Sequence, residues 1–149
     1  MKAHQPSNRK TSPVSAKNSR IYSHLVLCVD DELMQLKVCK LLLEQAGNEV
    51  ITSGDSKSAL AMFGSTAVQL VVLDYSMPKL NGAELARAMR RLKPNVPIVM
   101  LSGHSERPQD ADNVVDAYIR KGEEPGVLLE TVRELLGHNS APLKMYRRH

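Results

Sequence analysis

Short apolar or β-branched runs alternate with longer amphipathic stretches through most of this chain. The runs lie at residues 25–29, 49–54, 70–73, 97–101 and 117–121, and each has the length of one strand. The run at 70–73 holds only aliphatic side chains, which is typical of a strand buried on both faces. Apolar side chains at helical spacing occur between the runs, at residues 33–47, 56–63 and 83–92, and after the last run, at residues 125–138.

Capping signals support the helices. Gly47 ends the first helical stretch in a C-terminal capping role, and Ser56 is a candidate N-cap of the second. In the first stretch Lys37, Lys40 and Glu44 form one polar stripe, with apolar side chains around the rest.

The later helices also have an apolar periodicity. Leu85, Met89 and Leu92 fall at helical spacing in one of them. In the last helix, which ends at Gly137, Leu128, Val132 and Leu135 are predicted to face inward. Residues 105–116 are mostly polar, with a single valine pair, and predict only a short, poorly anchored helix.

Five strands alternating with five helical stretches predict an α/β fold. The expected architecture is a three-layer, doubly wound, five-stranded parallel sheet with right-handed crossovers. At 149 residues, 42% hydrophobic and 24% charged, the chain has the composition of one globular domain. Aromatic residues make up only 3%, so aliphatic side chains must fill the core.

The two cysteines and the hydropathy indicate that the protein lies in a reducing compartment and outside the membrane. Cys28 and Cys39 lie in apolar contexts without CxxC spacing. We therefore interpret them as core thiols in a reduced, cytoplasmic setting rather than as a disulfide or metal site. No apolar run approaches the roughly 18 residues of a membrane span, so no membrane association is expected.

Charge is distributed unevenly along the chain, although the formal net charge is only +4. Residues 1–20 hold five basic and no acidic side chains, whereas the chain between the tails is acidic. We predict a basic disordered arm at 1–20, one domain at 21–138 and a basic tail at 139–149. A transit peptide is the alternative for the arm.

Basic tails also suggest a rival function, nucleic-acid or polyanion binding. Such tails give salt-dependent, non-specific affinity. Only Tyr22 and Tyr146 supply aromatic rings near the tails, and no recognition helix is visible. The composition therefore does not favour a nucleic-acid partner.

Polar side chains follow several of the predicted strands. Asp30 and Asp31 follow the first, Asp74 the third and Ser102 the fourth, while Lys121 ends the fifth. Each alone could be a helix cap, a turn or a solvated strand end. In an open parallel sheet the carboxyl ends of the strands share one edge, where ligands bind, so together these residues predict a site.

The chemistry of these side chains is coherent. Clustered carboxylates repel one another by roughly 1 kcal/mol per pair in water and more when buried. Mg²⁺ relieves that repulsion, because it prefers oxygen ligands, water and phosphate. A lysine and a hydroxyl suit phosphoryl oxygens, and an aspartate can be the nucleophile that accepts a phosphoryl group.

Residues 21–138 resemble the receiver domain of two-component response regulators. The signature D-x-x-M-P-x-x-x-G is complete at residues 74–82, and the acidic pair of the family lies at 30–31. The switch hydroxyl and its small neighbour lie at 102–103, the aromatic switch position is Tyr118, and the lysine is Lys121. The resemblance implies a flavodoxin-like strand order 2-1-3-4-5.

The resemblance also implies the role of each site residue. Asp74 would accept a phosphoryl group from a histidine kinase or a histidine phosphotransfer protein. Asp31, Asp74 and the backbone carbonyl of Ser76 would ligate Mg²⁺, with Asp30 acting through a water. Lys121 would contact the phosphoryl group.

The family's switch is implied at two further residues. The Ser102 hydroxyl would move toward the phosphoryl group and draw Tyr118 inward. That movement would reshape the face made by residues 105–138. Ser76 and His104 would flank the path of hydrolytic water and tune the phosphoryl lifetime; a merely solvated loop histidine is the alternative for His104.

These roles imply a single-domain response regulator that signals to an unknown downstream protein and is not an enzyme beyond its own phosphorylation and dephosphorylation. A phosphorylation-dead scaffold is not favoured, because the acidic set is intact. Two departures from the family bear on output. Gly122 stands where a proline with a cis bond usually follows the lysine, and residues 105–116 form a shorter, more acidic segment than usual.

Overall fold

Strand β3 (Leu70–Asp74), the run predicted to be buried on both faces, is buried at every residue and lies at the centre of one parallel sheet. The computed structural model describes residues 23–79, 81–104 and 106–137. Its sheet has the order β2-β1-β3-β4-β5, which confirms the predicted fold. The other strands are β1 (Leu25–Val29), β2 (Glu49–Ser53), β4 (Ile98–Ser102) and β5 (Ala117–Arg120).

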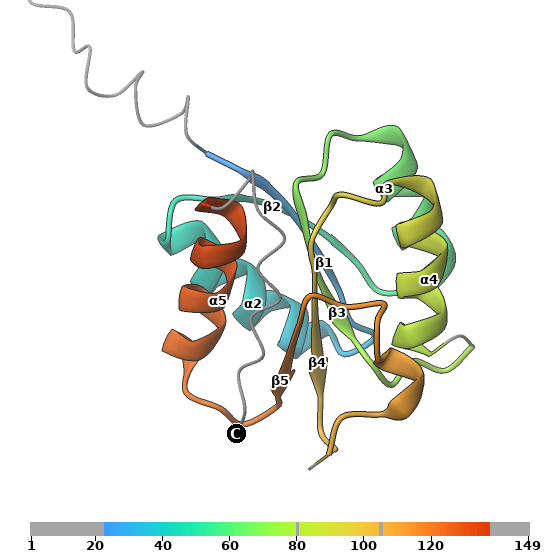
Figure 1. Cartoon of the computed structure of the whole chain (residues 1–149). Helices are drawn as coiled ribbons and strands as arrows, with labels where there is room; N and C mark the ends of the chain where they lie inside the picture. Colours follow the sequence, from blue (N-terminus) through green and yellow to red (C-terminus); the bar gives the residue numbers. More distant parts are fainter. Residues whose placement is uncertain (1–22, 80, 105, 138–149) are drawn as a thin grey trace, which may run out of the picture.

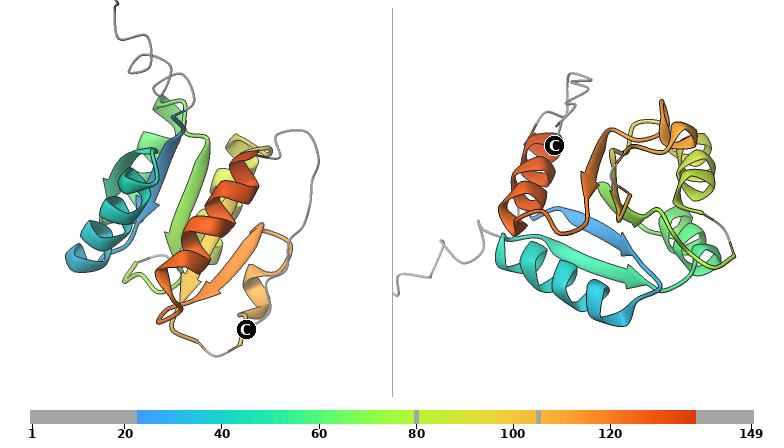
Figure 2. Two further views of the ribbon diagram at one scale, coloured as in Figure 1. Left: turned by 90° about the vertical axis from the view of Figure 1, so that its left-hand side faces the viewer. Right: turned by 90° about the horizontal axis from the view of Figure 1, so that it is seen from below.

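Helices cover both faces of this sheet (Figure 1). They are α2 (Leu33–Gln45), α3 (Ser56–Ser65), α4 (Gly82–Leu92) and α5 (Pro125–Gly137), with one 3₁₀ turn, η1 (Gln109–Ala111). Helices α2 and α5 lie on one face, and α3 and α4 lie on the other (Figures 1 and 2). Each face has its own apolar cluster, built around Leu43 and Val132 on the first and around Phe63 and Met89 on the second.

Local chemistry explains where the helices begin and end. The Asn81 side chain accepts a hydrogen bond from the Glu84 N–H and caps α4. The predicted cap Ser56 is wrong, because Asp55 caps α3 by accepting from the Ser58 N–H at 2.7 Å. Gly47 follows α2 with φ of 96°, as its capping role requires.

Some predicted helix faces differ from the observed ones. Leu85 and Met89 are fully buried, but Leu92 is 56% exposed at the end of α4. In α5 the more deeply buried leucine is Leu136 rather than Leu135. Helix α2 also carries exposed apolar side chains, at Leu33, Met34, Val38 and Leu41. Its apolar positions surround more of the helix than one packed face can bury.

The expected helix at 105–116 is wrong, since the described part of this segment forms only the turn η1. Nor is the segment poorly anchored. The Arg87 guanidinium donates to the Asp110 carbonyl at 2.7 Å. Arg90 donates to the Val114 carbonyl at 3.0 Å and to the Asp116 carboxylate at 2.7 Å. Side chains of α4 thus replace the backbone bonds that a helix would have made.

Both cysteines are free and buried, as predicted. None of the described helices is long and apolar enough to cross a membrane. The predicted arm at 1–20 and tail at 139–149 lie outside the described residues, so the domain bounds and the rival nucleic-acid function remain predictions.

Candidate phosphorylation site

Asp74 is the last residue of β3 and is only 3% exposed. On the β4 side it pairs with Leu101, and on the β1 side the ladder ends at the preceding residue, Leu73. Strands β1 and β4 flank β3, and the Tyr75 N–H continues the ladder by donating to the Leu101 carbonyl at 2.9 Å. A carboxylate is therefore fixed at the carboxyl edge of the sheet with little freedom to move.

Lys121 follows β5 and reaches back across the same edge. Its Nζ lies 2.9 Å from Asp74 Oδ1 and 3.6 Å from Asp30 Oδ2. Burial lowers the pKa of Lys121, but the Asp74 hydrogen bond and the charges of Asp74 and Asp30 outweigh it, and the pKa lies above its ordinary value. The lysine is thus held as a cation beside the phosphoacceptor candidate.

Asp30 directly follows β1 and is 6% exposed. Burial raises its pKa from 3.8 to about 6, with a further rise from the charge of Asp74. The Glu32 N–H, which donates to Asp30 Oδ1 at 2.9 Å, and Lys121 act in the opposite direction. The ionised form of this carboxyl group is therefore disfavoured, mainly because the group is buried.

Asp30, Asp31 and Asp74 form the acidic cluster, in which one carboxylate oxygen from each lies within 4.8 Å of the others. Asp31 is exposed, whereas its two partners are buried. The donor set is entirely oxygen, as a hard divalent cation requires. After burial, the charges of Asp74 and Asp31 also raise the pKa of Asp30, so the three carboxylates repel one another and a cation would relieve that repulsion. These residues fit a Mg²⁺ ion.

The stretch 74–82 ends in glycine because there is no space for a side chain at position 82. A Cβ at this position would lie 2.8 Å from Tyr75 Cα and 3.0 Å from the Asp74 carbonyl carbon, and closer still to the Asp74 carbonyl oxygen. The Gly82 N–H donates to the Tyr75 carbonyl at 2.6 Å. The start of α4 therefore packs directly on the backbone of the phosphoacceptor candidate.

Ser102 lies at the end of β4 and is 1% exposed. Its Oγ accepts from the His104 N–H at 3.1 Å, and its carbonyl accepts from the Lys121 N–H at 2.7 Å. The His104 ring lies edge-on to the Tyr75 ring, with centroids 5.4 Å apart. His104 is exposed apart from this ring contact, and its effect on the phosphoryl lifetime remains a prediction.

Comparison with known proteins agrees with this geometry. The sequence matches the family model for the response regulator receiver domain over residues 26–133. The chain belongs to the response regulator receiver family. It is 31% identical over 121 residues to the autoinducer 1 sensor kinase/phosphatase LuxN of Vibrio campbellii. The aligned region covers 80% of this chain but only 14% of LuxN.

Solved receiver structures have the same fold. A CheY-like receiver domain from Methanospirillum hungatei has a TM-score of 0.74 and 29% identity, covering 78% of this chain and 96% of that one. TrrA of Thermotoga maritima, solved in complex with Mg²⁺-BeF, has a TM-score of 0.72 and 32% identity, covering 75% and 98%. The chain is therefore a receiver of the phosphoacceptor signalling class.

Two features of this receiver were not anticipated from its sequence. The Tyr118 hydroxyl donates to the carbonyls of His104 and Glu106, at 3.2 and 3.3 Å. The Tyr75 hydroxyl donates to the Asp110 carboxylate at 3.1 Å. Sequence periodicity does not predict hydrogen bonds between residues this far apart. The only sign of them in the sequence was the aromatic residue that follows the phosphoacceptor candidate.

The turn after Lys121 also has a definite form. No cis peptide bond occurs among the described residues, and Gly122 has φ of 95°. Proline cannot adopt this angle, because its ring fixes φ near −65°. In this receiver a left-handed glycine turn thus stands where the family usually has proline.

Proposed function

We propose that this receiver accepts a phosphoryl group on Asp74, in the presence of Mg²⁺, from a histidine kinase or a histidine phosphotransfer protein. The phosphorylated receiver then signals through altered contacts with a downstream protein. The observation that carries the proposal is the position of Asp74, buried at the end of β3 with Lys121 Nζ at 2.9 Å and two further carboxylates beside it.

Transfer requires one bond to form and one to break. An Asp74 carboxylate oxygen bonds to phosphorus, and the donor's phosphorus–nitrogen bond breaks with its electron pair returning to the histidine. The transition state is loose, so positioning and charge neutralisation supply most of the acceleration. Burial at the strand end positions Asp74, and the Lys121 ammonium neutralises charge on the transferred oxygens.

Mg²⁺ would be held by Asp31, Asp74 and the backbone carbonyl of Ser76, with Asp30 acting through a water. When bound, the ion supplies charge compensation for the carboxylates and the phosphoryl oxygens. Exposure of Asp31 leaves one side of the acidic cluster open to solvent, which suits an ion that keeps several of its waters.

Ser102 and Tyr118 would be the switch. The Ser102 hydroxyl would turn toward the phosphoryl group and lose its bond from the His104 N–H. Because Tyr118 holds the carbonyls of His104 and Glu106, a shift of this loop would release Tyr118 as well. Ser76 and His104 would flank the approaching water, and replacing His104 with alanine should change the dephosphorylation rate.

The decisive experiment is intact mass after incubation with a small acyl-phosphate donor and Mg²⁺. The wild type should gain one phosphoryl group, Asp74→Ala should gain none, and EDTA should abolish labelling. Asp112→Ala is a matched control, because Asp112 is an exposed aspartate outside the acidic cluster. Labelling that persists in Asp74→Ala would overturn the site assignment.

A further inference from the structure

Two thiols lie in contact beneath the acidic cluster, and the proposed phosphorylation chemistry uses neither. Cys28 is in β1 and Cys39 is in α2, and their Sγ atoms are 3.2 Å apart. Cys28 is 1% exposed and Cys39 8%. They are also the only two cysteines of the chain, so any disulfide within one molecule must join them.

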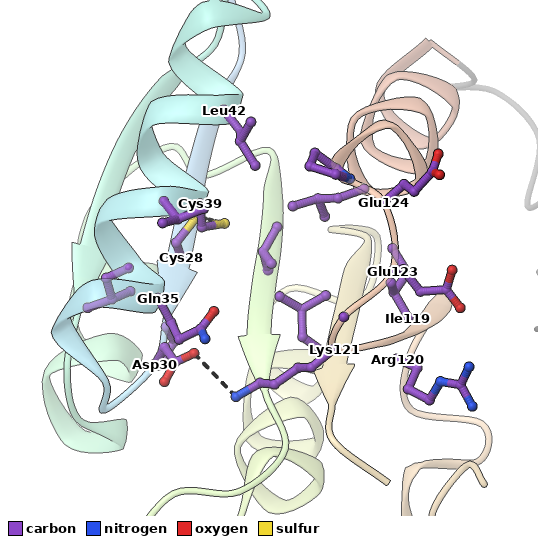
Figure 3. Close-up of a pocket in the computed structure, with 18 residues that line it drawn as sticks. Cys28, Asp30, Gln35, Cys39, Leu42, Ile119, Arg120, Lys121, Glu123 and Glu124 are labelled. Carbon is purple, nitrogen blue, oxygen red and sulfur yellow. Dashed lines mark hydrogen bonds and ion pairs between the residues drawn. The ribbon is translucent and has the colours of Figure 1, made fainter. Parts of the chain in front are cut away.

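A pocket gives access to this pair (Figure 3). It has a volume of about 180 Å³ and lies between α2, the sheet and the segment that joins β5 to α5. Both cysteines line it, and so do Asp30 and Lys121. Figure 3 shows the two sulfur atoms side by side in the pocket wall, on the same side as Asp30. The pocket is large enough to admit a water-sized oxidant.

We propose that Cys28 and Cys39 are a modification site that forms a reversible disulfide with hydrogen peroxide. The Cys39 sulfur attacks peroxide, the O–O bond breaks, and a sulfenic acid and one water result. The Cys28 sulfur then attacks the Cys39 sulfur, the S–S bond forms, and the hydroxyl leaves with the Cys28 proton as a second water. Two electrons pass from the thiols to the peroxide.

The required movement is small. The sulfur atoms must approach by roughly 1 Å to reach the length of a disulfide bond. Cys39 is the more exposed of the pair and lies on a helix, so it is the thiol that peroxide reaches first. A shift of α2 toward the sheet brings the sulfurs together.

The position of the disulfide in the chain gives it a consequence. The loop that it closes runs from residue 29 to residue 38 and contains Asp30 and Asp31. Oxidation therefore ties the segment that carries two members of the acidic cluster to both β1 and α2. The oxidised form holds this segment with less freedom than the reduced form. This inference does not depend on phosphorylation of Asp74.

The test treats the folded full-length chain with hydrogen peroxide, quenches with acid and alkylates in denaturant. The expected result is a mass loss of two hydrogen atoms, loss of both alkylatable thiols, and recovery of both with a dithiol reductant. Hydrogen–deuterium exchange of residues 29–38 should slow in the oxidised form, and its melting temperature should rise by several degrees.

Two single-thiol variants are the controls for this test. Cys39→Ser and Cys28→Ser each leave one thiol, and neither should lose two hydrogen atoms or gain melting temperature under peroxide. The proposal is overturned if the wild type keeps both thiols, gains oxygen on a cysteine instead of forming the disulfide, or forms only a disulfide between chains; oxygen gained on methionine is located separately by peptide mapping. If hydrogen–deuterium exchange at residues 29–38 is the same in the disulfide form as in the reduced form, the disulfide does not restrict the segment that carries Asp30 and Asp31.

Discussion

The Tyr75 hydroxyl donates a hydrogen bond to the Asp110 carboxylate, 35 residues further along the chain, over 3.1 Å. Tyr75 directly follows Asp74, and Asp110 belongs to η1. Asn81, at the other end of the same loop, donates to Asp110 at 3.2 Å. The loop that follows the phosphoacceptor candidate, between β3 and α4, is therefore attached at both ends to the segment between β4 and β5, which gives a direct route from Asp74 to that segment.

Tyr75→Phe should weaken this attachment without disturbing the acidic cluster. Burial, the Asp110 hydrogen bond and the Asp110 charge raise the pKa of Tyr75, so its proton stays on oxygen in the bond at neutral pH. We expect a loss of about 1 kcal/mol in the free energy of unfolding, measured by urea denaturation. Labelling by the small acyl-phosphate donor should remain.

A double-mutant cycle with Asp110→Ala tests whether the two residues act as a pair. The coupling energy should be about 0.5–1.5 kcal/mol. A coupling indistinguishable from zero would show that the loop and η1 are not held through this contact.

Asp30 should make the metal-free protein less stable as the pH rises. Its pKa is about 6 in the folded chain, against an ordinary value of 3.8, so between these values the native state binds more protons than the unfolded state. The free energy of unfolding should therefore fall from about pH 4 to pH 6, by at most about 1.4 kcal/mol per pH unit.

Denaturation in EDTA across this range measures the slope. Asp30→Asn carries no titrating group at this position and should flatten it. Added Mg²⁺ should raise stability at pH 7 in the wild type. A slope that is the same in Asp30→Asn would place the titrating group elsewhere.

Sequence reasoning placed the sheet and the acidic cluster because both depend on local patterns. The aliphatic run before Asp74 and the alternation of strands and helices fix which strand ends share an edge. The failures concern contacts that cross the fold. The apolar positions of α2 did not reveal that Leu33, Met34, Val38 and Leu41 would stay exposed. The polar segment 105–116 did not reveal that Arg87 and Arg90 would hold it from α4. Hydrogen bonds between side chains of one element and a distant segment leave no periodic pattern in the sequence, so they could not be predicted from it.

Gly82→Ala should be destabilising because of space rather than backbone angle. The added Cβ would meet the backbone of Asp74 and Tyr75, which is held by the sheet and cannot withdraw easily. We expect a loss of about 1–3 kcal/mol in the free energy of unfolding, together with slower labelling of Asp74. The matched control is Gly64→Ala in α3, where a Cβ would meet nothing within 4 Å; it should be neutral or stabilising by up to about 1 kcal/mol. Equal changes in the free energy of unfolding in the two variants would show that close packing at Gly82 is not the cause.

Gly122→Pro should impair the receiver, even though proline is the family's usual residue after the lysine. Gly122 has φ of 95°, and proline holds φ near −65°, so the turn must rearrange. That turn sets the start of the Lys121 side chain, whose Nζ lies 2.9 Å from Asp74 Oδ1. We expect Gly122→Ala to cost about 1–2 kcal/mol from its left-handed angle alone and to keep most labelling. Gly122→Pro should cost more and slow labelling strongly, because it also displaces the lysine.

Gly126→Ala is the control for this pair, since Gly126 lies in α5, has no left-handed angle and has open space around its Cβ position. Unfolding curves and the rate of mass gain from the acyl-phosphate donor are measured on all three variants. If Gly122→Pro is as stable as the wild type and labels as fast, the turn can adopt the family's proline form, and the glycine is a neutral replacement. If it loses labelling but not stability, the turn acts only by aiming Lys121 at Asp74.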